Sequence, residues 1–163
     1  MAETPHLDEF ARTLAHGVDG VTGISVVRDA PIAPFTSLKI GGVARLLVRA
    51  TSQYELVAVA DAAAMHGVPT LILGGGSNVI VADEGFDGLV IKLDASSATR
   101  HAGTIAPDAL RDGDGSLDSD VTLVDVEAGC QTAGLARWAS RQGLAGVEWA
   151  CGIPGTIGGA VAG

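Results

Sequence analysis

The sequence predicts an α+β fold that includes a parallel strand–helix–strand unit. The hydrophobic share of 47% against 18% charged residues is enough to build a globular core. Residues 44–73 read as a strand, a helix and a second strand, an order that makes the strands parallel and the crossover right-handed. The strands predicted after this unit are separated by glycine-rich turns or by a polar loop.

The segment before this unit is expected to form a helix and an extended lead-in, which together make up residues 1–33. A helix is predicted over residues 6–17, because Leu7, Phe10, Ala11 and Leu14 repeat at helical spacing and Gly17 provides a stop. Residues 30–35 contain two prolines and are expected to be extended.

Within the unit, residues 44–50 are predicted to form the first strand. Ser52 and Glu55 have the spacing of a capping box, which opens a helix over residues 52–66. Gly67 ends this helix, and the apolar residues 69–73 form the second strand.

Further elements follow in chain order: strand 79–81, turn 83–88, strand 89–93, strand 121–127 and helix 131–142. Gly143 is expected to end the last helix. Residues 94–120 are polar and without periodicity, so we expect a long surface loop or an irregular hairpin tip there.

The amino-acid composition argues against some classes of binding partner, nucleic acids and membranes among them. A net charge of −9 with only 10 lysines and arginines argues against a nucleic-acid-binding surface. Any bound phosphate would therefore depend mainly on backbone N–H groups. Neither a signal peptide nor an apolar run long enough for a membrane is visible, so we expect a soluble cytoplasmic protein. Cys130 and Cys151 have no metal-binding spacing and are interpreted as free thiols.

The first glycine-rich loop, residues 73–78, follows the predicted strand 69–73. Three consecutive glycines can turn the backbone so that successive N–H groups form an anion-binding nest, to which Ser77 and Asn78 can add donors. The loop lacks the later glycine and the helix of a dinucleotide fingerprint, and no lysine closes it as in a P-loop. The alternative is an ordinary tight turn between strands.

The second glycine-rich loop, residues 152–159, contains four glycines in eight residues, together with Pro154 and Thr156. Because it carries no charge, it suits a flat ring or a pyrophosphate that the backbone approaches closely. The alternative is an ordinary loop that leads into a helix.

No catalytic or metal-binding group can be assigned from spacing. Asp83, Glu84 and Asp87 lie in a glycine-rich turn and are interpreted as solvated. The four histidines are scattered, and no nucleophile motif is present. On motifs alone, the chain offers a phosphate-binding scaffold without a catalytic apparatus.

The chain resembles the UDP-N-acetylenolpyruvoylglucosamine reductase (MurB) family from about Pro34 to the last residue. The motifs that carry the resemblance occur in the family's order: residues 35–42, 71–79, 83–91, 143–148 and 152–160. Several motifs in one order are more specific than any single glycine string.

The resemblance implies a two-lobed FAD-binding fold of the vanillyl-alcohol-oxidase (PCMH) type, with a small parallel βαβ lobe and a mostly antiparallel lobe. The family uses NADPH to reduce FAD, which then reduces the enolpyruvyl group of a UDP-sugar to give UDP-N-acetylmuramate for peptidoglycan. By resemblance, the FAD-binding residues are Leu73, Gly74, Gly75, Gly76, Ser77, Asn78, Ile153, Pro154, Gly155, Thr156, Gly158 and Gly159.

The resemblance has two departures. The chain stops at Gly163, so we expect residues 34–163 to be an FAD-binding domain incomplete at its C-terminal end. The family's substrate-binding domain and catalytic residues are then absent, and the chain alone is expected to be inactive. Residues 94–120 are also longer than the family usually has. The alternatives are the FAD domain of another oxidase of the same superfold and an inactive nucleotide-binding fragment.

Overall fold

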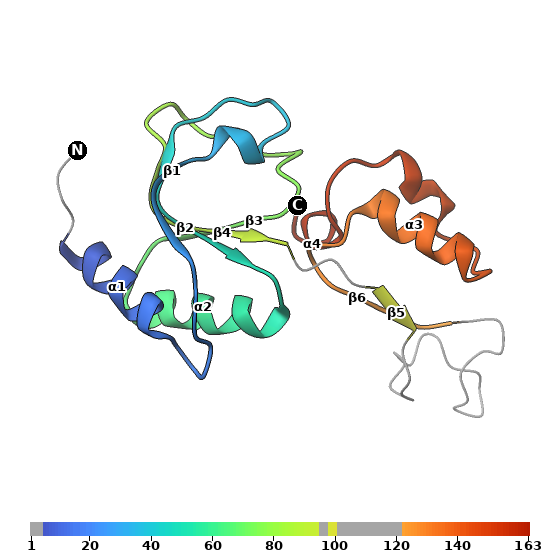
Figure 1. The fold of residues 1–163 in the computed structure, drawn as a ribbon. Helices are drawn as coiled ribbons and strands as arrows, with labels where there is room; N and C mark the ends of the chain where they lie inside the picture. The colour runs from blue at the N-terminus through green and yellow to red at the C-terminus, as the bar shows by residue number, and fades with distance from the viewer. Residues whose placement is uncertain (1–4, 95–97, 101–121) are drawn as a thin grey trace.

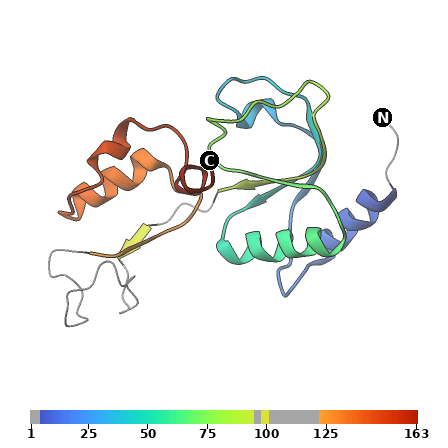
Figure 2. The ribbon, with the colours of Figure 1, turned by 180° about the vertical axis from the view of Figure 1, so that it is seen from behind.

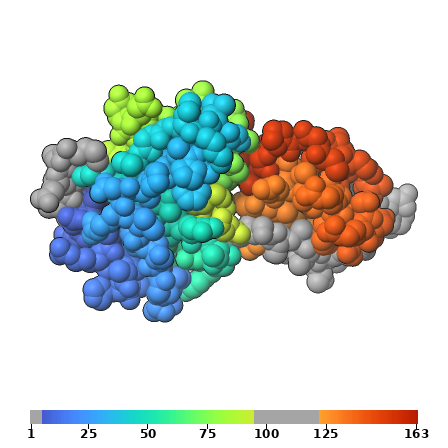
Figure 3. Space-filling view, turned by 45° about the horizontal axis from the view of Figure 1, so that its top comes forward, coloured from blue at the N-terminus to red at the C-terminus, as the bar shows by residue number. Residues whose placement is uncertain are grey.

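The computed structural model describes residues 5–94, 98–100 and 122–163, which form two lobes (Figure 1). The first lobe contains, in chain order, α1 (Pro5–His16), β1 (Val26–Pro31), the 3-10 helix η1 (Ala33–Phe35), β2 (Val43–Ala50), α2 (Gln53–Met65), β3 (Thr70–Leu73) and β4 (Phe86–Leu93). The second lobe contains β5 (Ala98–Arg100), β6 (Val124–Val126), α3 (Thr132–Arg141), the 3-10 helix η3 (Glu148–Gly152) and α4 (Ile157–Ala162). The space-filling view shows these lobes as two bodies that meet near the middle of the molecule (Figure 3).

The sheet of the first lobe is mixed and has the order β1-β2-β4-β3. β1 pairs with β2 in antiparallel fashion, whereas β2 and β3 both run parallel to β4. The predicted strand–helix–strand unit is therefore present as β2–α2–β3, but β4 lies between its two strands. Leu89, Val90 and Ile91 of β4 are fully buried, and an uninterrupted apolar run of this kind favours a strand that is covered on both faces.

Helices α1 and α2 cover one face of this sheet (Figures 1 and 2). Phe10 and Leu14 of α1 and Val59 of α2 are fully buried there, in one core cluster with alternate residues of the strands, including Val48 and Ile91. The other face is covered by the segments around residues 32–35 and 79–86, which complete a second core cluster. This second cluster holds the end of β3 in place.

The predicted capping of α2 is present. The Ser52 hydroxyl oxygen accepts a hydrogen bond from the Glu55 backbone N–H at 3.1 Å. The Glu55 carboxylate reaches back to the backbone N–H of Thr51 at 2.9 Å, one residue before the position that an ideal capping box would use. After α2, Gly67 has a φ of 63°, which is the left-handed conformation typical of a helix C-terminus.

The second lobe begins with a short antiparallel pair, in which Ala98 of β5 is opposite Val126 of β6 and Arg100 is opposite Val124. Helix α3 follows as predicted, and Gly143 beyond its end has a φ of 69°. The predicted strand 121–127 is shorter in the structure. Most of the predicted loop 94–120 lies outside the described residues.

Three local predictions differ from the structure. Residues 79–81 form no strand, because Val79 and Val81 bury their side chains against the second core cluster from an irregular loop. Residues 33–35 are not extended but form η1, in which Pro34 has the preset φ that suits a first helical turn. Strand β1 was not predicted, because an edge strand that is mostly exposed lacks an apolar alternation.

Replacing Ser52 with Ala should destabilise the protein by about 1 kcal/mol, because the Glu55 N–H loses its acceptor at the start of α2. Urea unfolding followed by circular dichroism measures this change. Ser140→Ala is the matched control, since Ser140 is exposed within α3 and caps no helix start. Equal stability of the two variants would contradict the role of the cap.

Candidate functional site

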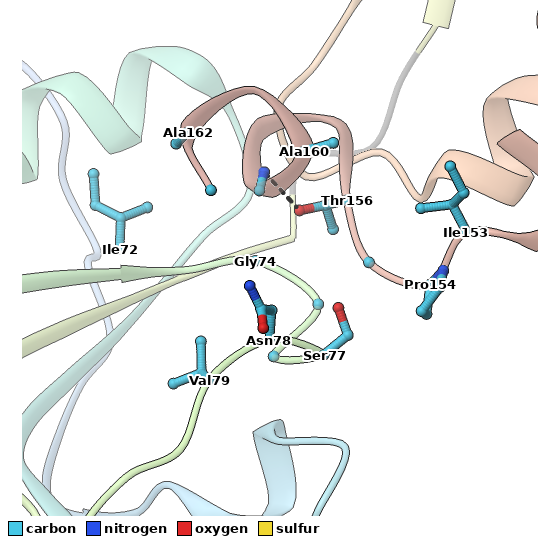
Figure 4. Close-up of a pocket in the computed structure, with 15 residues that line it drawn as sticks. Ile72, Gly74, Ser77, Asn78, Val79, Ile153, Pro154, Thr156, Ala160 and Ala162 are labelled. Atoms are coloured by element: carbon cyan, nitrogen blue, oxygen red, sulfur yellow. Dashed lines mark hydrogen bonds between the residues drawn. The ribbon is translucent and has the colours of Figure 1, made fainter.

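A cavity of about 420 Å³ lies where the first lobe meets the second, and both glycine-rich loops line it (Figure 4). The first loop follows the carboxyl end of β3, which is the end of a parallel strand where open α/β sheets bind ligands. The second loop precedes α4. Two segments about 75 residues apart in the sequence are thus brought together at one site.

Most of the predicted site residues line this cavity. They are Gly74, Gly75, Gly76, Ser77, Asn78, Ile153, Pro154, Gly155, Thr156 and Gly159. Leu73 does not line it, because its side chain is buried in the second core cluster. Gly158 does not line it either. Its backbone N–H donates to the Ala128 carbonyl at 2.8 Å, and a Cβ on Gly158 would stand 2.7 Å from the Ala128 Cβ.

The two loops pack backbone against backbone. A Cβ built on Gly75 would lie 3.1 Å from the Gly155 Cα, and one built on Gly74 would overlap the Thr156 hydroxyl. A Cβ on Gly155 would in turn lie 2.8 Å from the Ser77 hydroxyl oxygen. Side chains at these glycines would force the loops apart, so their absence allows the cavity to have this shape.

Gly76 is the residue of the triplet that adopts a left-handed conformation, with a φ of 64°. A Cβ at this position would overlap the carbonyl oxygen of Phe35. The Gly76 carbonyl also accepts a hydrogen bond from the Ser37 backbone N–H at 2.9 Å. The first loop is therefore held against the segment that follows η1.

The first loop has backbone donors to offer. Within the described part of the chain, the N–H groups of Gly75, Gly76 and Ser77 donate to no protein acceptor. Gly76 is buried, and a buried N–H without a partner is rare unless a ligand or water satisfies it. These successive donors therefore fit an anion that is bound by the backbone.

The N-terminus of α4 has no such donors free. The N–H groups of Ile157 and Gly158 donate to the carbonyls of Cys130 and Ala128, each at 2.8 Å. The Gly159 N–H donates to the Thr156 hydroxyl oxygen at 3.4 Å, drawn as a dashed line in Figure 4. The helical N–H groups of α4 are therefore satisfied within the protein, whereas the first loop and the N–H groups of Gly155 and Thr156 donate to no acceptor among the described residues.

The lining of the cavity is largely apolar and uncharged. Ser77, Asn78 and Thr156 are its polar side chains, and none of its lining residues is acidic, basic or a histidine. Burial and the neighbouring Glu127 raise the pKa of the Cys130 thiol, which is buried and does not line the cavity. The site can hold a flat, partly apolar molecule with a phosphate group, and it offers no acid or base within the described residues.

The charged residues lie elsewhere. The predicted turn 83–88 is shorter in the structure, because β4 already begins at Phe86; Asp87 lies at the start of this strand, where its exposed carboxylate pairs with Arg45 at 3.5 Å. Burial of Asp94 acts to raise the pKa of its carboxyl, but hydrogen bonds from Arg49 and Lys92 outweigh this effect and keep the pKa below its usual value. No group of three potential metal ligands occurs among residues 5–94, 98–100 and 122–163. In the same part of the chain, no helix has the length and apolarity needed to cross a membrane.

Comparison with known proteins agrees with this geometry. The family described as FAD binding domain matches residues 44–163, which include both glycine-rich loops. This chain belongs to the FAD-binding domain family. Its α+β fold, with a mixed sheet, is the one that the resemblance to MurB implied.

The relatives of this domain include several reductases. The chain is 44% identical over 133 residues to the UDP-N-acetylenolpyruvoylglucosamine reductase of Rubrobacter xylanophilus, covering 82% of this chain and 39% of the relative. It is 39% identical over 141 residues to UDP-N-acetylenolpyruvoylglucosamine reductase 2 of Symbiobacterium thermophilum, covering 82% and 40%. The chain thus spans about two fifths of the length of these relatives.

A solved structure shows the same fold. The crystal structure of MurB from Thermus caldophilus superposes with a TM-score of 0.52 at 28% identity, covering 85% of this chain and 41% of that one. The resemblance found in the sequence, to the FAD-binding region of the MurB family, is confirmed.

Several lining residues were missed in the sequence, although a signal for two of them was present. Ile72 lies in β3 two residues before Gly74, and alternate positions along a strand face the same side of the sheet. Its half-exposed side chain lines the cavity. Ala160 lies four residues after Thr156 and therefore on the same face of α4. Val79 and the last residues of α4 gave no such signal.

Replacing Gly76 with Ala should destabilise the protein by about 3 kcal/mol or more, because a left-handed alanine is strained and its Cβ must displace the Phe35 carbonyl. Gly67→Ala is a matched control. Gly67 has nearly the same φ, 63°, but a Cβ at this position would meet nothing within 4 Å. We therefore expect this variant to lower the free energy of unfolding by only about 1 kcal/mol. Thermal and urea unfolding measure both, and equal losses would show that the close packing at Gly76 does not matter.

Proposed function

We propose that this chain binds FAD as the cofactor domain of an NADPH-dependent reductase of UDP-N-acetylenolpyruvoylglucosamine, a step that forms UDP-N-acetylmuramate for peptidoglycan. The observation that supports this most strongly is the meeting of two glycine-rich loops around one uncharged cavity with free backbone donors. The substrate is proposed from the relatives, which are UDP-N-acetylenolpyruvoylglucosamine reductases.

The residues present fit FAD. The N–H groups of Gly75, Gly76 and Ser77, with the side chains of Ser77 and Asn78, are suited to the pyrophosphate. Ile153 and Pro154, together with Ile72, provide apolar surface for a ring system. A Cβ at Gly74 or Gly75 would disturb the contact between the loops that frames this space.

When bound, FAD supplies two-electron transfer between NADPH and the enolpyruvyl group. The residues of this chain bind and orient the cofactor, and the apolar lining keeps water away from part of it. We propose residues 34–163 as the FAD-binding domain and residues 1–33 as its lead-in. The residues that act on the substrate are then supplied by the remaining length of a MurB-type protein, in a cytoplasmic enzyme.

We expect FAD to bind saturably, with an affinity that does not fall as salt rises. The described residues that line the cavity include no cation for salt to screen, and the net charge of −9 repels an anionic ligand at low ionic strength. Fluorescence quenching of FAD between about 50 mM and 500 mM NaCl measures this. A tenfold loss of affinity over that range would contradict binding by backbone donors.

Gly75→Val should weaken FAD binding, because the branched side chain must push against Gly155 and Thr156 and distort the cavity. Gly134→Val, in α3 at a half-buried position where a Cβ meets only the Gln131 side chain at 3.7 Å, controls for adding a valine. The same titration measures both variants. Unchanged FAD binding by a folded Gly75→Val protein would place the cofactor elsewhere.

Residues 1–163 alone should not oxidise NADPH at an enzymatic rate with the enolpyruvyl sugar nucleotide, because the lining offers no acid or base. Absorbance of NADPH under steady-state conditions, with FAD added, measures the rate. Sustained turnover would contradict the assignment of catalysis to the remaining part of the reductase.

A further inference from the structure

Thr132 is a buried polar residue that touches the second glycine-rich loop from outside the cavity. It is the first residue of α3 and is 3% exposed. Its hydroxyl donates a short hydrogen bond to the Ile153 carbonyl and lies 3.4 Å from the Gly155 carbonyl oxygen. Its backbone N–H donates to the same Gly155 oxygen at 3.2 Å. Thr132 does not itself line the cavity.

These bonds direct two carbonyl oxygens of the loop toward α3. Ile153 and Gly155 both line the cavity, so their carbonyls could otherwise turn toward a ligand. A carbonyl oxygen is an acceptor with partial negative charge, and no lysine, arginine or histidine is among the described residues that line the cavity to offset it. Turning one of them inward would oppose a phosphate and would also reshape the loop that packs against Gly75.

We propose that Thr132 is a positioning residue for FAD, whose hydroxyl holds the Ile153 carbonyl out of the cofactor cavity. This inference rests on the proposed function. The Gly155 carbonyl keeps the backbone N–H of residue 132 as a donor whatever the side chain is. Among the described residues, the Thr132 hydroxyl is the donor to the Ile153 carbonyl, and no backbone N–H donates to that oxygen. Removing the hydroxyl therefore leaves the Ile153 carbonyl without its hydrogen bond, while the Gly155 carbonyl keeps one.

Three substitutions separate the hydroxyl from the methyl group. Thr132→Val keeps the shape and loses the hydroxyl, Thr132→Ser keeps the hydroxyl and loses the methyl, and Thr132→Ala loses both. Thr13→Val is a control, since the Thr13 hydroxyl donates to the Glu9 carbonyl within α1, far from the cavity. Each variant is made in the complete 163-residue chain. Its affinity for FAD is measured by fluorescence quenching, and its folding without FAD by circular dichroism and thermal unfolding.

The Val and Ala variants should bind FAD about tenfold more weakly than wild type, whereas Ser and the Thr13 control should stay within about twofold. A role in stability alone would lower the unfolding midpoint of the Val variant and leave the affinity of its folded form unchanged, which would overturn the inference. Failure of both Val and Ala to fold without FAD would overturn it too. Absence of binding by wild type would overturn the proposed function together with this inference.

Discussion

The architecture of the site depends on the contact of the Gly74 and Gly75 backbone with the Gly155 backbone and the Thr156 side chain. On one side, the first loop is fixed by the end of β3 and by Gly76, which fits against the Phe35 carbonyl. On the other, the second loop is fixed by Thr132 and by the bonds from the start of α4 to residues 128–130. The two lobes are therefore joined at the place where the cavity is formed, and any change that separates the loops also changes the cavity.

The way in which donors are distributed explains how an acidic protein can present a site for an anion. Helix α4 is six residues long. Its first N–H groups donate hydrogen bonds to neighbouring carbonyls and to the Thr156 hydroxyl. The first loop instead leaves consecutive N–H groups without a partner in the described chain, and no acidic side chain is among the described residues that line the cavity. For the proposed anion site, this arrangement means that charge selection would rest on backbone dipoles and on the exclusion of acidic side chains, without a favourable net charge.

The sequence predicted best where the chemistry is local. Ser52 and Gly67 mark the ends of α2 because capping involves residues only a few positions apart. Local patterns failed where distant contacts decide. Val79 and Val81 have the composition of a strand but pack, half-buried, from a loop, and β1 is an edge strand whose residues are mostly exposed and show no apolar alternation. The meeting of the two glycine-rich loops was accessible only through the family resemblance, since spacing alone cannot bring residues 74 and 156 together. Thr132 carries no motif, and only its buried contacts revealed it.

The central position of β4 has a consequence for how the chain assembles. β2 and β3 are both complete by residue 73, yet neither pairs with the other, because each forms its parallel ladder with a strand made of residues 86–93. Before residues 86–93 are present, the edges of β2 and β3 that face β4 therefore have backbone N–H and C=O groups without a strand partner, and only β1 and β2 can pair. Such unpaired edges expose a nascent chain to aggregation until the last strand inserts between them. Assembly of the cofactor cavity, which begins at the end of β3, comes after that insertion.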